Sequence, residues 1–190
     1  MDTLNLELLV KDGMEIEANQ VQYSLLDRRA ENQLLPLCRK EKIKLLVFGV
    51  VAGGVLSDSF LGISKEQAQA KTSDSVSRRM YWSSLERWST DWALFQELLE
   101  TLRAVGQRLS PQPQNVAFVA CAWALQRLES LGAGGALILG VRDAGHLEEH
   151  RALLDGEVKL GAADMDQIQA VLDKGLSPQG DIWYQERGWL

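Results

Sequence analysis

The sequence predicts an α/β fold built on a parallel sheet. Residues 16–24 and 44–51 are strand-like, and a segment with helical spacing lies between them. Strand, helix and strand therefore follow one another along the chain, and such a unit implies a right-handed crossover. Residues 44–51 show almost no polar alternation, which is typical of parallel strands that are covered on both faces.

Two helical signals accompany these strands. Residues 5–10 form an apolar run that ends near Gly13, which predicts the last turns of a helix. Residues 30–42 carry apolar side chains at helical spacing, with charges on the opposite face. Pro36 lies inside this second segment and lacks a backbone N–H, so we expect the helix to begin late or to be kinked there.

The segment 57–88 interrupts the alternation of strands and helices. It contains Gly62 and the polar stretch 64–77, and we expect a long loop inserted into the domain. Insertions of this length in a compact domain are usually functional or mobile. The segment is a candidate wall of a substrate pocket, although no single residue in it indicates a role.

The rest of the chain returns to regular patterns. Thr90 and Asp91 predict a helix cap, and apolar residues then recur along one helical face. The elements expected here are, in order, a helix from 90 to 109, a buried helix at 115–128, a short buried strand at 136–139 and helices at 144–154 and 164–174.

Composition limits the class of protein. The chain has 190 residues, is 46% hydrophobic and carries a net charge of −6, so we expect one domain, here 1–190. Its charges are interleaved, which argues against non-specific nucleic-acid binding. No apolar stretch is long enough for a membrane span. Cys38 and Cys121 are too few for a disulfide framework, and we expect buried thiols in the cytoplasm or another reducing compartment.

Several residues at the predicted strand ends could bind a ligand, and each has a simpler interpretation. The Gln20 amide could pair with an amide of a ligand, although a bond to backbone is the better reading from the sequence alone. Phe48 could stack on a flat ring or simply fill the core. The loop Ala52-Gly53-Gly54 could approach a phosphate closely, but double glycines are common in loops.

The last predicted strand is followed by further candidates. Arg142 precedes a helix N-terminus and could bind phosphate, whereas a lone arginine more often forms a surface ion pair. His146 and His150 lie four residues apart on one helix. Without a third ligand nearby, we interpret them as solvated side chains rather than a metal site. Glu148 and Glu149 are likewise a solvated face.

Two segments carry a resemblance to a known family. Residues 19–29 (NQVQYSLLDRR) and 44–57 (KLLVFGVVAGGVLS) resemble consecutive strand-and-loop units in the second half of the aldo/keto reductase barrel. The resemblance covers nearly the whole chain in the family's order. It implies the C-terminal half of a (β/α)8 TIM barrel, that is, an incomplete barrel, with NADP(H) as cofactor.

The resemblance also implies roles for individual residues. Gly49 stands where the family commonly has serine, and His146 and His150 also depart from its pattern. The implied cofactor contacts are Asn19, Gln20 at the nicotinamide carboxamide, Phe48 stacked on the nicotinamide, Gly49, Val51, Ala52, Gly53 and Gly54 in the pyrophosphate loop, which Leu56 also matches, Gly140, Val141 and Arg142 at the 2′-phosphate, and His146, Glu149 and His150 at the adenosine end.

No residue of the chain matches the family's catalytic Asp, Tyr, Lys and His. Tyr23, Tyr81 and Tyr184 lie in other segments. We therefore expect the chain to hold the cofactor-binding half of an enzyme that reduces aldehydes or ketones, and to be inactive alone. The alternatives are an NADP(H)-sensing or protein-interaction module and a remnant without function. Because a cut barrel exposes strand edges, we expect a homodimer, a complementary half-barrel or rearranged packing.

Overall fold

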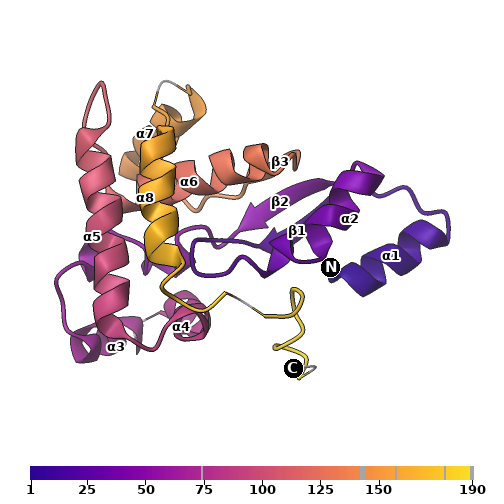
Figure 1. The fold of residues 1–190 in the computed structure, drawn as a ribbon, viewed down its shortest axis with the longest axis horizontal. Helices are drawn as coiled ribbons and strands as arrows, with labels where there is room; N and C mark the ends of the chain where they lie inside the picture. Colours follow the sequence, from indigo (N-terminus) through magenta and orange to yellow (C-terminus); the bar gives the residue numbers. More distant parts are fainter. Residues whose placement is uncertain (74, 142–143, 157, 178, 189–190) are drawn as a thin grey trace.

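A three-stranded parallel sheet lies at the centre of the molecule (Figure 1). The computed structural model describes residues 1–73, 75–141, 144–156, 158–177 and 179–188. The strands are β1 (Ala18–Gln22), β2 (Lys44–Phe48) and β3 (Gly135–Leu137), in the order β1-β2-β3. Gln22 pairs with Phe48, and Val47 pairs with Leu137. The predicted α/β class with a parallel sheet is confirmed.

Helices make up most of the rest of the described chain. They are, in chain order, α1 (Thr3–Lys11), α2 (Leu34–Glu41), α3 (Lys65–Ser73), α4 (Val76–Trp88), α5 (Trp92–Arg108), α6 (Val116–Ser130), α7 (Ala144–Leu154) and α8 (Ala162–Leu172), with 3-10 turns at Arg29–Glu31, Ala52–Gly54 and Asp58–Phe60. Helices α5 and α8 run side by side, and α6 also packs on α5 (Figure 1). In the part of the chain that the structure describes, no helix is long and apolar enough to cross a membrane.

The helix boundaries follow local chemistry. Helix α2 begins at Leu34, so Pro36 falls in the first turn, where a backbone donor is not required; the expected late start is confirmed. Asp91 caps α5 by accepting a hydrogen bond from the Ala93 amide at 2.9 Å. Asn115 caps α6 in the same way through the Phe118 amide at 2.8 Å.

The segment 57–88 is not the long loop that its polar composition suggested. It holds a 3-10 turn and the helices α3 and α4. Ser75 caps α4 by accepting from the Arg78 amide. Tyr81, Leu85 and Trp88 are buried at spacings of four and three residues, so a narrow apolar stripe suffices to hold α4 against the core.

The expectation that β3 is a buried strand was wrong. Gly135 and Ala136 are exposed and Leu137 is only half-buried. Strand β3 lies at the edge of the described sheet and pairs with β2 alone. A Cβ at Gly135 would lie 2.0 Å from the Leu45 carbonyl oxygen, so glycine is required for this close approach.

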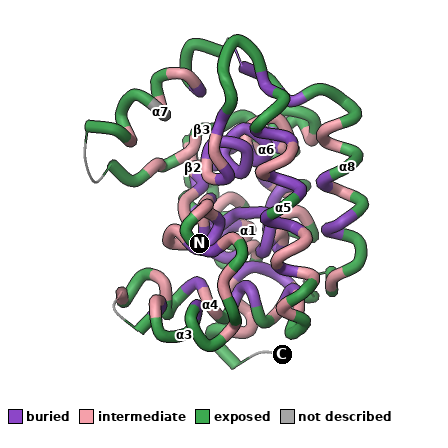
Figure 2. The backbone as a smooth tube through the Cα atoms, turned by 90° about the vertical axis from the view of Figure 1, so that its left-hand side faces the viewer, coloured by how far each residue is buried: buried purple, intermediate pink, exposed green. Residues whose placement is uncertain are grey.

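The two faces of the sheet are packed differently. Val21, Leu45 and Val47 are fully buried, and α2 and α6 contact the sheet at β2 and β3. On the other face Gln20 is exposed and Phe48 is half-buried. Figure 2 shows the buried residues gathered around the sheet, α5 and α6, whereas α7 is largely exposed. Cys38 and Cys121 are both buried, as predicted.

Candidate functional site

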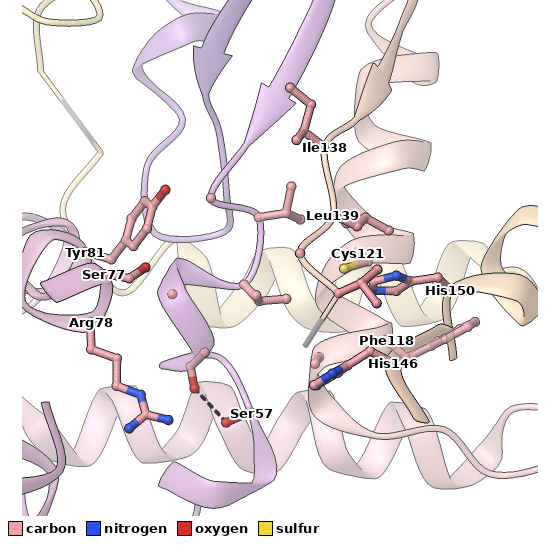
Figure 3. Close-up of a pocket in the computed structure, with 18 of the residues that line it drawn as sticks. Ser57, Ser77, Arg78, Tyr81, Phe118, Cys121, Ile138, Leu139, His146 and His150 are labelled. Atoms are coloured by element: carbon pink, nitrogen blue, oxygen red, sulfur yellow. Dashed lines mark hydrogen bonds between the residues drawn. The ribbon is translucent and has the colours of Figure 1, made fainter. Parts of the chain in front are cut away.

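A cavity of about 770 Å³ opens where β2 and β3 end (Figure 3). Its walls come from the loops after these two strands and from α4, α6 and α7. Cofactor and small-molecule sites usually measure about 300–1,000 Å³. The cavity therefore has the size and the position, beyond the carboxyl ends of parallel strands, of a ligand site in an α/β protein.

Helix α4 forms the polar wall of the cavity. Ser77, Arg78 and Tyr81 lie on this side in Figure 3. The Arg78 guanidinium lies 5.8 Å from the centre of the Phe60 ring and donates to the Lys71 carbonyl at 3.2 Å. Its buried Nε atom meets no hydrogen-bond acceptor among the described residues. Of the described residues that line the cavity, Arg78 alone is an arginine or a lysine. Its positive charge makes this wall suitable for an anion.

The glycine loop after β2 forms the floor. Gly49, Gly53 and Gly54 have φ values of 73°, 63° and 91°, a region that favours glycine. The loop already uses part of its donors internally, because the Ala52 and Gly54 amides donate to the Gly49 and Val51 carbonyls at 2.8 and 2.9 Å. An anion on this floor would therefore also need donors from the α4 wall.

The wall opposite α4 is more apolar and includes a pair of histidines. Phe118 and Cys121 of α6 lie beside His146 and His150 of α7 (Figure 3). The two imidazole rings are roughly stacked, with centroids 6.5 Å apart. Within the described residues no group of three His, Cys, Asp or Glu side chains could hold a metal ion. Flat rings at this wall suit a planar ligand group better than a metal.

The structure brings many of the predicted cofactor residues to this cavity. Those that line it are Gly49, Val51, Gly53, Gly54, Gly140, Val141, His146 and His150. Ala52 lies fully buried in the same loop. Arg142 lies outside the described residues, and of Glu149 the structure describes only its place in α7.

Asn19, Gln20 and Phe48 do not line the cavity. Asn19 is buried, where its amide oxygen accepts from the Met1 amino group at 2.7 Å and its nitrogen donates to the Met1 carbonyl at 2.9 Å. Gln20 is exposed on the open face of the sheet. Phe48 stacks on Trp183, with centroids 6.4 Å apart and an interplanar angle of 21°.

A buried ion-pair cluster fixes the C-terminal segment that carries Trp183. Arg29 is fully buried and donates to Asp27 at 2.8 and 2.9 Å and to Glu186 at 2.7 and 2.9 Å. Arg87 of α4 reaches Asp27 at 3.3 Å. Burial by itself raises the pKa of Glu186, but the hydrogen bonds and charge of Arg29 outweigh it, so that the pKa lies below its ordinary value.

Sequence reasoning missed three residues of this region. Arg78 and Tyr81 lie in the segment interpreted as a loop, and Trp183 lies in the C-terminal tail. The available signal was the sequence Ser-Val-Ser-Arg-Arg at 75–79, a helix cap followed by basic residues. That signal predicts an anion-binding helix start only weakly, because it contains no information on what faces it.

The fold and cavity define an α/β protein with a ligand-sized cavity at its strand ends. The sequence matches the aldo/keto reductase family over residues 4–173, and the chain belongs to this family. None of the curated proteins compared with it matches.

Solved structures show the same fold. An aldo-keto reductase from Bacillus halodurans in its holo form is 18% identical, with a TM-score of 0.61, over 98% of this chain and 49% of that chain. Its apo form is 17% identical, with a TM-score of 0.59, over 98% and 52%. A glycerol dehydrogenase from Gluconobacter oxydans is 13% identical, with a TM-score of 0.65, over 95% and 50%. The chain spans about half the length of these relatives, and the expected half-barrel fold class is confirmed.

Proposed function

We propose that this chain supplies the NADP(H)-binding part of an aldo/keto reductase that reduces an aldehyde or a ketone. The observation that carries the proposal is the cavity beyond β2 and β3, where a glycine loop faces the guanidinium of Arg78. In (β/α)8 barrels this end of the strands holds the active site, and phosphate groups bind the loops after the last strands. Bound NADPH would supply the hydride.

The residues of the cavity fit such a cofactor. At Gly54 a Cβ would meet nothing within 4 Å, so a diphosphate can approach the loop backbone there, whereas Tyr81 covers Gly49 and Gly53. The buried Nε of Arg78 has no hydrogen-bond partner among the described residues. In this proposal His146 and His150 border the adenosine, and Arg142 and Glu149 remain predicted contacts at the same end.

Phe48 remains the predicted partner of the nicotinamide, together with Gln20, which lies on the same open face of β1 and β2. The Phe48 ring is half-buried and faces Trp183. Asn19 is the least suited of the predicted contacts, because both ends of its amide are bound to Met1.

Calorimetric titration of the 190-residue chain with NADPH and NADH tests the proposal. We expect NADPH to bind more tightly than NADH. Arg78→Met should weaken NADPH binding by about tenfold or more, since a hydrogen bond to a charged group is worth about 1.5–3 kcal/mol. Arg79→Met is the matched control, because Arg79 is the exposed neighbour on the same helix and does not line the cavity. Absence of NADPH binding by the unaltered chain would refute the proposal.

A second candidate function is an NADP(H)-sensing or protein-interaction module. Two observations favour it: Trp183 covers the Phe48 ring, and the hydroxyl of buried Tyr23 is committed to Glu31 at 2.6 Å. Burial, together with the charge of Glu31, raises the pKa of Tyr23 well above its ordinary value. Tyr23 is therefore unsuited to donate a proton in catalysis. NADPH oxidation by the intact cellular protein with a panel of aldehydes and ketones separates the two functions. Turnover supports the reductase, and binding without turnover supports the sensor.

A further inference from the structure

The ring of Tyr81 rests directly on the glycine loop after β2. A Cβ at Gly49 would lie 2.5–2.8 Å from atoms of the ring edge and hydroxyl, and a Cβ at Gly53 would lie 2.8 Å from the ring. Such distances are closer than van der Waals contact allows. Both glycines therefore make room for this ring, which is only 6% exposed.

The hydroxyl of Tyr81 is an unused donor in the wall of the cavity. It makes no hydrogen bond to any of the residues that the structure describes, although Tyr81 lines the cavity and its side chain is nearly buried. The hydroxyl oxygen is not one of the fully buried polar atoms that lack a partner, so it is accessible to a ligand or to water. Burial also raises the pKa of Tyr81, so the phenol keeps its proton at neutral pH. It can therefore donate a hydrogen bond to an acceptor atom in the cavity.

The position of this hydroxyl determines which ligand atoms it can reach. Gly49 directly follows Phe48 at the end of β2, whereas Gly53 and Gly54 lie further along the same loop, and all three glycines line the cavity. Tyr81 contacts the loop at both Gly49 and Gly53, so it stands between the end of the strand and the double glycine. Arg78 lies on the same side of the cavity, three residues earlier on α4 (Figure 3).

We propose that the Tyr81 hydroxyl donates a hydrogen bond to a diphosphate oxygen of the bound dinucleotide, on the side of the nicotinamide ribose. The inference rests on the proposed function, because it needs a dinucleotide that runs from Phe48 across the glycine loop. A neutral donor to an anionic oxygen forms a strong, charge-assisted hydrogen bond. Tyr81 would then hold the nicotinamide half of the ligand, and Arg78 would hold the more distant anionic groups.

The test compares two ligands on the full chain and on Tyr81→Phe, which removes only the oxygen and keeps the ring over the loop. The ligands are NADP⁺ and adenosine 2′,5′-bisphosphate, which lacks the nicotinamide ribose and its phosphate. We expect the Kd for NADP⁺ to rise about tenfold in Tyr81→Phe, with the Kd for the bisphosphate changed less than about twofold. Arg78→Met, by contrast, should weaken both ligands.

Three results would overturn the inference in distinguishable ways. An unchanged Kd for NADP⁺ in Tyr81→Phe means that the hydroxyl contacts no ligand atom. Equal weakening of both ligands means that the substitution displaced the loop instead of removing one bond. If the unaltered chain binds neither ligand, the proposed function itself fails, and the role of Tyr81 fails with it.

Discussion

At the scale of single residues, the contact between Phe48 and Trp183 decides how the open face of the sheet can be used. The two rings stack at 6.4 Å, and Trp183 has a positive φ of 70°, which is unusual for a tryptophan. Ile182 beside it is fully buried. The tail thus holds an indole where the proposed function needs a nicotinamide.

Replacing this indole tests whether the tail competes with the cofactor. We expect Trp183→Ala to tighten NADPH binding by about fivefold, because an aromatic pair is worth about 0.5–1.5 kcal/mol and must be given up before Phe48 can meet another ring. Fluorescence titration with NADPH measures the effect. Trp82→Ala is the control, since Trp82 stacks on Trp92 and does not line the cavity. Weaker binding in Trp183→Ala would instead make the indole part of the site.

Glu186 provides the anchor of this tail, and its ionisation links the anchor to pH. The pKa of Glu186 lies below its ordinary value of 4.5 because Arg29 stabilises the carboxylate against the cost of burial. A carboxyl group with a depressed pKa contributes stability above its unfolded pKa and loses that contribution as pH falls through its folded pKa. The tail anchor is therefore fully formed near neutral pH.

We expect Glu186→Gln to lower the free energy of unfolding at pH 7 by about 1 kcal/mol, a modest value because the carboxylate is partly exposed. The difference from the unaltered chain should shrink as the pH falls below about 4.5. Urea unfolding at a series of pH values measures it. Glu148→Gln, on the exposed face of α7, should leave stability unchanged. A difference that is constant with pH would argue against ionisation of Glu186 as its cause.

At the scale of elements, α5 shows how one small residue can set the packing of a helix. Leu98, Leu102 and Val105 are fully buried along one face of α5. Gly106 follows them, and its carbonyl accepts from the Gln114 amide at 2.9 Å. A Cβ at Gly106 would lie 2.3 Å from the Gln114 carbonyl oxygen. The turn between α5 and α6 therefore depends on the missing side chain.

Gly106→Ala reverses the usual effect of this substitution in a helix. Alanine normally favours a helix interior by about 1 kcal/mol relative to glycine. Here we expect a loss of about 2 kcal/mol, because the added methyl group overlaps backbone that must shift. Urea unfolding measures the change, and Gln107→Ala, at the exposed next position, should be close to neutral. A stabilised Gly106→Ala variant would show that the turn relaxes without cost.

At the scale of the whole molecule, the described sheet ends on both sides without a partner. Strand β2 pairs with both of its neighbours, whereas β1 and β3 each pair on one side alone among the described residues. The chain covers about half of the length of its structural relatives. We infer that these edges are where further strands of a barrel, from whatever source, would pair.

Hydrogen exchange measured by mass spectrometry tests this arrangement. We expect the amides of β2 at Lys44–Phe48 to exchange most slowly, and those of β3 at Gly135–Leu137 to exchange at least tenfold faster, because the edge strand opens at a lower free energy. The core of α5 supplies the reference for full protection. Protection of β3 equal to that of β2 would mean that another chain covers this edge in solution.

The sequence alone determined the order and type of most elements, because local chemistry encodes them. Caps such as Asp91 and Asn115 and the apolar run of β2 act over a few residues, so periodicity reveals them. The resemblance to the aldo/keto reductases placed the glycine loop and the two histidines together, and the structure does bring them to one cavity. The exposed position of β3 could not be predicted in this way, since it depends on what lies beside the strand.

The tertiary structure decided what faces the loops. Arg78 and Tyr81 join the cavity because α4 packs against the glycine loop. Trp183 reaches Phe48 because Arg29 and Glu186, far apart in the sequence, form an ion pair. Contacts between such distant residues leave no periodic signal in the sequence, and their free energy arises only when the chain has folded. The glycine loop of the cavity floor was thus predictable from the sequence, whereas the charged wall on α4 and the tail that covers Phe48 were not.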